Sequence, residues 1–213
     1  MSEFFLHERL ARSEKTLQRL SRCRITVCGA GALGANLCET LARTGAGTLR
    51  VIDKDRIEPH NLSTQPYFKS DVGSFKARIL AHNLYRALGT KIEAVPEELT
   101  AASLDKLLKD SELVVDTFDN SVSRQLVSDW CRQREVPCLH AGLAAGFAEV
   151  LWNEVYRVPS PAAGQDDCNY PLARNLVMLT VAVTAEVILT WLGRDQQANY
   201  TITLDDLAVR PFR

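Results

Sequence analysis

The feature that most constrains the fold is the stretch RITVCGAGALGAN, in which an apolar run leads directly into three closely spaced glycines. RITVC is typical of a short buried strand, and Leu33, Leu37 and Leu41 recur at the four-residue spacing of a helix. A second apolar run, GTLRVID, follows that helix. Because parallel strands need a crossover connection, the segment predicts a β-α-β unit with parallel strands and a right-handed crossover.

Strand and helix patterns continue to alternate as far as His140, which is typical of a doubly wound α/β fold. We expect strands at KIEAV, ELVVD and VPCLH, helices over residues 8–22, 75–88, 103–110 and 121–135, and an irregular segment over 55–70. Beyond residue 140 we expect a strand-like run, a long helix over about 172–192 and a short terminal strand at NYTITL. These patterns predict one domain over residues 1–213, with a mostly parallel sheet and a partly antiparallel C-terminal extension.

The composition favours one well-filled core and excludes several classes of partner. Apolar residues make up 46% and charged residues 24%, and the net charge of −1 leaves no broad basic field for nucleic acid. The apolar run at residues 4–6 is too short for a signal peptide. The apolar segment from Leu176 contains Glu186 in its middle, which favours a buried core helix over a membrane span.

The cysteines show no paired spacing. There are six, with no CxxC pair among them, which fits reduced thiols in the cytoplasm. Five lie in predicted strands or helices and are expected to be buried apolar fillers: Cys23, Cys28, Cys38, Cys131 and Cys138. His140, at a strand end, is expected to be a structural histidine with its hydrogen bonds satisfied.

The glycine turn predicts a nucleotide site. Gly29, Gly31 and Gly34 allow a tight turn, close approach of a phosphate and close helix–strand packing, and the helix N-terminus offers free N–H groups. Asp53 ends the next strand, where a carboxylate can accept hydrogen bonds from ribose hydroxyls. The glycines alone leave a nicotinamide cofactor and ATP both open.

The residues after Asp53 carry a more specific pattern. Asp53 and Asp55 form an Asp-x-Asp pair, NLSTQ follows, then GSFK, and later DTFDNSVSR. Together these motifs resemble the ThiF/MoeB/HesA family, the bacterial relatives of ubiquitin-activating enzymes, over roughly residues 8–193. The resemblance implies a Rossmann-like fold and Mg²⁺-ATP-dependent adenylation of a carboxylate, at best the C-terminal Gly-Gly of a ubiquitin-like or sulfur-carrier protein, by a homodimer.

The resemblance also implies roles for single residues. Lys76 would face the phosphates, Asp119 would hold Mg²⁺ and Asp53 would hold the ribose. Asn61, Gln65 and Arg124 would orient the phosphates or the loop around them. The full set expected at the nucleotide is Gly29, Ala30, Gly31, Leu33, Gly34, Asp53, Asp55, Asn61, Gln65, Lys76, Asn120 and Arg124.

The sequence departs from the family pattern at several places. Thr64 stands where relatives commonly carry an arginine, and Arg56, Arg9 or Arg12 are the candidates to replace it. The two CxxC pairs that hold a structural zinc in many relatives are absent. Cys168 lies where a relative that forms a thioester or persulfide with its carrier places a cysteine, although the loop composition around it favours an ordinary loop cysteine.

Three other functions stay open at this point. A different acceptor, such as a peptide amide or a modified tRNA base, is a second enzymatic hypothesis within the family. A nucleotide-binding subunit that has lost its activity would tolerate the change at Thr64 and the missing zinc loop. A nicotinamide-dependent oxidoreductase is the third and weakest hypothesis.

Overall fold

The computed structural model describes residues 3–159 and 171–212, and one eight-stranded sheet organises them. The strand order is β3-β2-β1-β4-β5-β6-β7-β8. The five strands from β3 to β5 pair in parallel, and β6, β7 and β8 add to them in antiparallel pairing. The strands are β1 Arg24–Cys28, β2 Thr48–Ile52, β3 Ile92–Val95, β4 Leu113–Asp116, β5 Cys138–Ala144, β6 Phe147–Trp152, β7 Tyr200–Thr203 and β8 Ala208–Pro211. The predicted fold class, with its antiparallel C-terminal extension, is confirmed.

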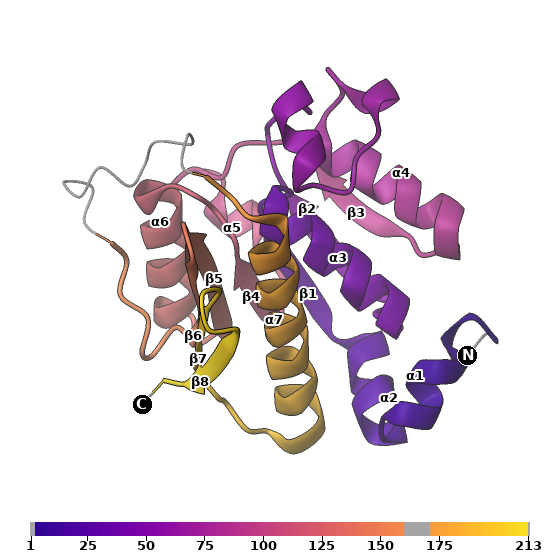
Figure 1. Cartoon of the computed structure of the whole chain (residues 1–213), viewed down its shortest axis with the longest axis vertical. Helices are drawn as coiled ribbons and strands as arrows, with labels where there is room; N and C mark the ends of the chain where they lie inside the picture. Colours follow the sequence, from indigo (N-terminus) through magenta and orange to yellow (C-terminus); the bar gives the residue numbers. More distant parts are fainter. Residues whose placement is uncertain (1–2, 160–170, 213) are drawn as a thin grey trace.

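Helices cover both faces of this sheet (Figure 1). The α-helices are α1 Leu6–Ala11, α2 Glu14–Arg22, α3 Ala32–Thr44, α4 Lys76–Leu88, α5 Leu104–Leu107, α6 Ser121–Gln133 and α7 Arg174–Arg194. Buried residues of α2, α3, α4 and α7 join one hydrophobic cluster, and those of α5 and α6 join a second cluster. The sheet therefore separates two cores, as expected for a doubly wound arrangement.

The long apolar helix α7 packs against the rest of the molecule. It is long and apolar enough to cross a membrane, but more than half of its apolar stretch is buried in the structure. Leu176, Val177 and Ile188 are fully buried, and the helix packs on α3, α2 and β6. Glu186 pairs with Arg12, whose Nη2 lies 2.5 Å from Glu186 Oε1. The expectation of a core helix agrees with this packing.

Two expectations for the chain ends were wrong in detail. The helix predicted over residues 8–22 is broken into α1 and α2, because Arg12 is extended and Ser13 caps α2 by accepting a hydrogen bond from the Thr16 N–H at 3.2 Å. At the other end, NYTITL forms one arm of a hairpin, and β8 is a further strand that the sequence pattern missed.

The segment expected to be irregular contains two short 3-10 helices, Pro59–Ser63 and Lys69–Asp71.

Candidate active site

The sheet has a topological switch point beside β1. From β1 the chain builds β2 and β3 on one side and later β4 and β5 on the other. In open α/β sheets, ligands bind outside the carboxyl ends of the strands at such a point. A cleft of about 420 Å³ lies there, and it is lined by residues that follow β1, β2, β3 and β4.

The glycine turn after β1 forms the floor of this cleft. Gly29 has φ +105°, a left-handed conformation that favours glycine. A Cβ on Gly34 would lie 2.0 Å from the Gly29 carbonyl oxygen, so only glycine lets α3 pack this closely on the turn. A Cβ on Gly31 would meet no atom within 4 Å, and Gly31 lines the cleft. The backbone at Gly31 is therefore open to a ligand at the N-terminus of α3.

Asp53 ties the glycine turn to the end of β2. Its Oδ2 accepts a hydrogen bond from the Ala30 N–H at 2.6 Å, and its Oδ1 accepts one from the Asp55 N–H at 2.7 Å. Burial raises the pKa of Asp53, although the charge of Lys76 and the two N–H bonds act in the opposite direction. Each carboxylate oxygen keeps a second lone pair, so Asp53 can still accept a hydrogen bond from a ligand hydroxyl.

Lys76 begins α4 and reaches the same cleft. The residue is only 8% exposed, and its Nζ lies 3.5 Å from Asp55 Oδ2. Tyr67 supports both sides of this corner, because its hydroxyl donates to the Ala30 carbonyl at 2.8 Å and lies 3.4 Å from the Lys76 carbonyl. The result is a buried cation held beside the glycine turn.

The loop between β4 and α6 forms the opposite wall. Asp119 is exposed and lines the cleft next to Asn120, which caps α6 by accepting a hydrogen bond from the Ser123 N–H at 2.8 Å. Leu99, Phe118 and Leu126 give this wall an apolar surface. An acidic group at the rim and an apolar wall are thus combined on one side of the cleft.

A buried network holds that loop in place. Asp116 Oδ1 accepts a hydrogen bond from the Phe118 N–H, and Asp116 Oδ2 lies 2.9 Å from His140 Nδ1. His140 Nε2 lies 2.8 Å from Asn153 Oδ1, and the ring stacks on Tyr156. Burial opposes ionisation of Asp116, but Arg124 and the hydrogen bonds from His140 and Phe118 outweigh it and lower the pKa of Asp116. His140 is therefore a structural histidine, as expected.

Six of the twelve residues expected at the nucleotide do not line the cleft, namely Ala30, Leu33, Gly34, Asn61, Gln65 and Arg124. Asn61 accepts a hydrogen bond from the Glu58 N–H at 2.9 Å and closes a turn. Arg124 donates to the carbonyls of Phe118 and Ala141 and to Tyr156 Oη, which braces the β4–α6 loop from behind. Gln65 lies in a different cavity, described below. Of the two roles considered for these residues, Asn61 and Arg124 have the geometry of loop supports.

Several other predicted residues also lie in supporting or buried positions. Ala30 contributes its N–H to Asp53, and Leu33 is buried at 8% exposure under the turn. Arg12 pairs with Glu8 and Glu186, so it lies in ion pairs within this chain. The five cysteines expected in strands or helices are all buried, and burial raises the pKa of Cys23 and Cys38 to about 12. Cys168 lies outside the described residues.

Sequence reasoning missed two supporting side chains. Thr117 donates its hydroxyl to the Cys28 carbonyl at 2.8 Å and lies against both Gly29 and Gly34. Tyr67 joins the glycine turn to Lys76, as described above. A polar residue directly after a buried strand was the available signal for Thr117, whereas nothing in the local pattern identified Tyr67.

The residues present fit an adenine nucleotide. Open backbone at a helix N-terminus and a buried lysine match a phosphate chain, and Asp53 matches a ribose. Two further acids of the cleft, Glu97 and Glu98, already pair with Lys106 and Lys54. Within residues 3–159 and 171–212 no three His, Cys, Asp or Glu side chains gather as a metal site. Mg²⁺ commonly uses one or two carboxylates together with phosphates, so Asp119 suits that pattern.

The curated proteins most similar in sequence include adenylyltransferases and E1 activating enzymes. The chain is 38% identical over 115 residues to a sulfur carrier protein adenylyltransferase of Thermus thermophilus, covering 53% of this chain and 42% of the relative. It is 35% identical over 128 residues to the SAMP-activating enzyme E1 of Haloferax volcanii, covering 59% of this chain and 47% of that enzyme. The chain thus aligns with less than half the length of these two relatives.

Solved structures and a family model agree on the fold. The crystal structure of E. coli MccB with ATP superposes with a TM-score of 0.81 at 16% identity, covering 100% of this chain and 72% of MccB. That of PaaA superposes with a TM-score of 0.77 at 19% identity, covering 93% and 66%. At these identities the likeness shows the fold alone. The model of the ThiF family matches residues 7–199, and the chain therefore belongs to the ThiF family.

Proposed function

We propose that this protein is an ATP-dependent adenylyltransferase that activates the C-terminal carboxylate of a ubiquitin-like or sulfur-carrier protein. The observation that carries the proposal is the convergence of Asp53, Lys76 and Asp119 around the open Gly31 backbone, at the switch point of a ThiF-family fold. The names of the relatives, which are sulfur-carrier adenylyltransferases and E1 enzymes, support the choice of substrate.

The chemistry asks for positioning and charge neutralisation. A carboxylate becomes a good electrophile once its oxygen attacks the α-phosphorus of ATP and pyrophosphate leaves, which forms an acyl-adenylate. Lys76 would stabilise the negative charge that develops on the phosphates, and Asp53 would fix the ribose. The apolar surface of Leu99, Phe118 and Leu126 suits a purine. Bound Mg²⁺ supplies further charge neutralisation, and Asp119 would hold it.

Several finer features belong to the same proposal. The carrier would end in Gly-Gly, the enzyme would act as a homodimer in the cytoplasm, and residues 1–213 would form one adenylation domain. A later transfer step would pass through Cys168. The rival hypotheses are an inactive nucleotide-binding subunit, another acceptor such as a peptide amide or a tRNA base, and an oxidoreductase.

Exchange of labelled pyrophosphate into ATP tests the proposal. With Mg²⁺, ATP and a panel of carriers ending in Gly-Gly, we expect carrier-dependent exchange by the wild type. We expect Lys76→Ala and Asp119→Ala each to abolish exchange, because each removes a charge that faces the nucleotide. Lys69→Ala, which changes an exposed lysine outside the cleft, is the matched control and should exchange normally. Cys168→Ala should keep exchange and lose only later transfer.

The other outcomes separate the rivals. ATP binding without exchange on any carrier would favour the inactive subunit. Tight nicotinamide binding without ATP binding would favour the oxidoreductase. Full exchange by Lys76→Ala and Asp119→Ala would mean that the assignment of these residues is wrong.

A further inference from the structure

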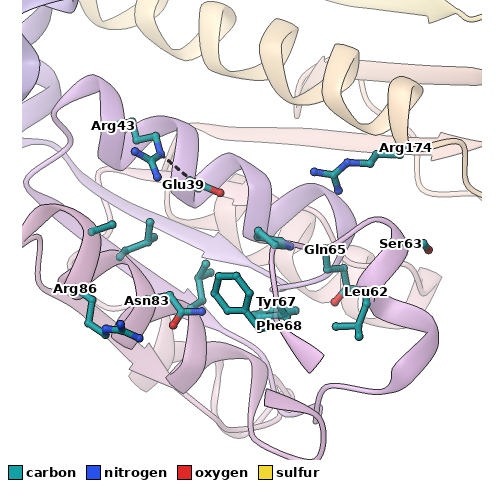
Figure 2. A pocket seen from close by; sticks show the side chains of 14 residues that line it. Glu39, Arg43, Leu62, Ser63, Gln65, Tyr67, Phe68, Asn83, Arg86 and Arg174 are labelled. Carbon is teal, nitrogen blue, oxygen red and sulfur yellow. Dashed lines mark hydrogen bonds and ion pairs between the residues drawn. The ribbon is translucent and has the colours of Figure 1, made fainter. Parts of the chain in front are cut away.

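A second and larger cavity lies away from the strand ends. It has a volume of about 600 Å³ and lies between α3, α4 and the segment that joins β2 to α4, with the first residue of α7 at its rim (Figure 2). We call it the α3–α4 cleft; the residues used below are Gln65, Tyr67, Asn83, Leu84, Arg86 and Arg174. None of these side chains lines the nucleotide cleft, and of them only Tyr67 also supports it, through its hydrogen bonds to the glycine turn and to Lys76.

Two amide side chains in this cleft each have one buried atom without a hydrogen-bond partner in the described part of the chain. Gln65 is 9% exposed, and its Oε1 is buried without a donor. The Nδ2 of Asn83 is likewise buried without an acceptor. Leaving such a group unpaired costs about 1–3 kcal/mol, and the terminal amide torsions of Gln and Asn are soft enough to turn toward an occupant. An occupant that offers both a donor and an acceptor, as the backbone of a peptide does, would satisfy these two atoms.

The rim of the cleft carries three arginines, Arg43, Arg86 and Arg174. Arg43 pairs with Glu39 at 2.8 Å, as the dashed line in Figure 2 marks. Arg86 and Arg174 are exposed at the rim, and neither has an ion pair within the described part of the chain. Guanidinium groups bind carboxylates in bidentate geometry, so the rim favours an acidic occupant.

The wall between these polar groups is apolar. Tyr67 and Leu84 line the cleft with only 6% and 3% of their surface exposed, and Phe68 at its edge is 63% exposed. A free inorganic anion would use the arginines but would leave the apolar wall and both amides unmatched. An extended chain with an apolar side chain, a carboxylate and backbone amides would match all three features.

We propose that the α3–α4 cleft binds an extended peptide segment of a partner protein, one that carries at least one apolar side chain and one carboxylate. The site goes beyond the adenylation reaction, and binding to it needs no nucleotide. Only the side chain of Tyr67 would separate this peptide from the glycine turn, because Tyr67 lines the cleft and its hydroxyl donates to the Ala30 carbonyl.

The test uses an array of acetylated hexapeptides in which every position is varied through the twenty amino acids. Without ATP, we expect the full-length protein to select peptides that contain Asp or Glu beside an apolar residue. The double variant Arg86→Glu/Arg174→Glu should lose at least tenfold in binding to the selected peptides. Arg22→Glu/Lys109→Glu, which makes the same change in net charge at exposed residues outside the cleft, should bind as the wild type does.

A second variant and a second measurement keep the test decisive. Gln65→Leu removes the unpaired oxygen and should weaken peptide binding about fivefold without lowering the stability of the free protein. In the ¹⁵N–¹H spectrum, the side-chain amide of Asn83 should shift when a selected peptide is added. No acidic selection, or equal binding by the Arg86→Glu/Arg174→Glu variant, would overturn the proposal. Sedimentation that finds this variant monomeric and the wild type dimeric would also overturn it, because the occupant would then be a second copy of the chain. A failure of pyrophosphate exchange has no bearing on these results.

Discussion

At the residue scale, the site depends on polar side chains whose backbone partners are already fixed. Asp53 holds two N–H groups from two different loops, and its carboxylate is 7% exposed at the cleft. A residue in this position supports the local fold and faces a ligand at once. Substitutions of Asp53 would therefore change the stability of the fold and the binding of the ligand together. The glycines Gly31 and Gly34 allow these two effects to be measured separately.

Gly34 and Gly31 provide that separation. Gly34→Ala would place a Cβ 2.0 Å from the Gly29 carbonyl, so we expect a loss of about 3 kcal/mol in the free energy of unfolding. Gly31→Ala meets no atom within 4 Å and should change the stability by less than about 0.5 kcal/mol, while it lowers ATP affinity. Urea unfolding and ATP titration measure the two effects. Equal stability of the two variants would contradict the packing described for Gly34.

Asp116 predicts how stability depends on pH. Its folded-state pKa lies below the ordinary value of 3.8, so its ionised form stabilises the fold. That contribution is fully present above the unfolded-state pKa of about 4 and is lost as the pH falls through the lower folded-state value. Asp116→Asn should destabilise the protein by about 3 kcal/mol at pH 7, because it leaves the buried partners of the carboxylate uncompensated.

Unfolding in urea between pH 7 and pH 2 measures this difference. The gap between the wild type and Asp116→Asn should narrow as the pH falls below about 4. Asp129→Asn, at an exposed position of α6, is the matched control and should differ little from the wild type at any pH. A gap that stays constant with pH would mean that ionisation of Asp116 contributes nothing to stability.

At the scale of elements, the hydroxyl of Tyr67 joins the glycine turn before α3 to the start of α4. Tyr67 follows the helix Pro59–Ser63 and bonds the turn before α3 while it touches the start of α4. Asn36 adds a second link, because its Nδ2 donates to the Thr64 carbonyl at 2.8 Å. Thr64 thus uses its backbone carbonyl to anchor α3.

Tyr67→Phe tests the first link. Loss of the hydroxyl leaves the buried Ala30 carbonyl without this donor, so we expect a cost of about 1 kcal/mol in unfolding free energy and weaker ATP binding. Tyr85→Phe removes the hydroxyl of a tyrosine that is 53% exposed on α4 and should leave both quantities unchanged. Equal unfolding free energies and equal ATP affinities of the two variants would mean that the Tyr67 hydrogen bond contributes nothing to stability or to binding.

The elements also mark where sequence reasoning succeeded and where it failed. Strands β1, β2 and β4 were predictable because each is a short, mostly buried apolar run in a parallel sheet. The break at Ser13 was missed because helix-favouring residues lie on both sides of it, and only the cap reveals it. β8, with mostly exposed residues, has no apolar pattern to detect.

At the scale of the whole molecule, topology brings the predicted site residues together. Asp53, Lys76 and Asp119 are far apart in sequence but line one cleft at the edge of the sheet, where the family resemblance had placed them; their roles toward the nucleotide stay predictions. Asn61 and Arg124 lie behind the loops, and their hydrogen-bond partners depend on tertiary structure. The α3–α4 cleft was not predictable, since it forms between elements that no motif joins.

The most direct test of the central claim is intact-mass spectrometry of a candidate carrier after incubation with the enzyme, ATP and Mg²⁺ in the absence of any acceptor. The account predicts that the carrier gains the mass of one adenylyl group, which is AMP less one water, with the wild type and gains none with Lys76→Ala. A carrier that binds the enzyme while ATP is also bound, but gains no AMP, would contradict the assignment of this cleft as an adenylation site.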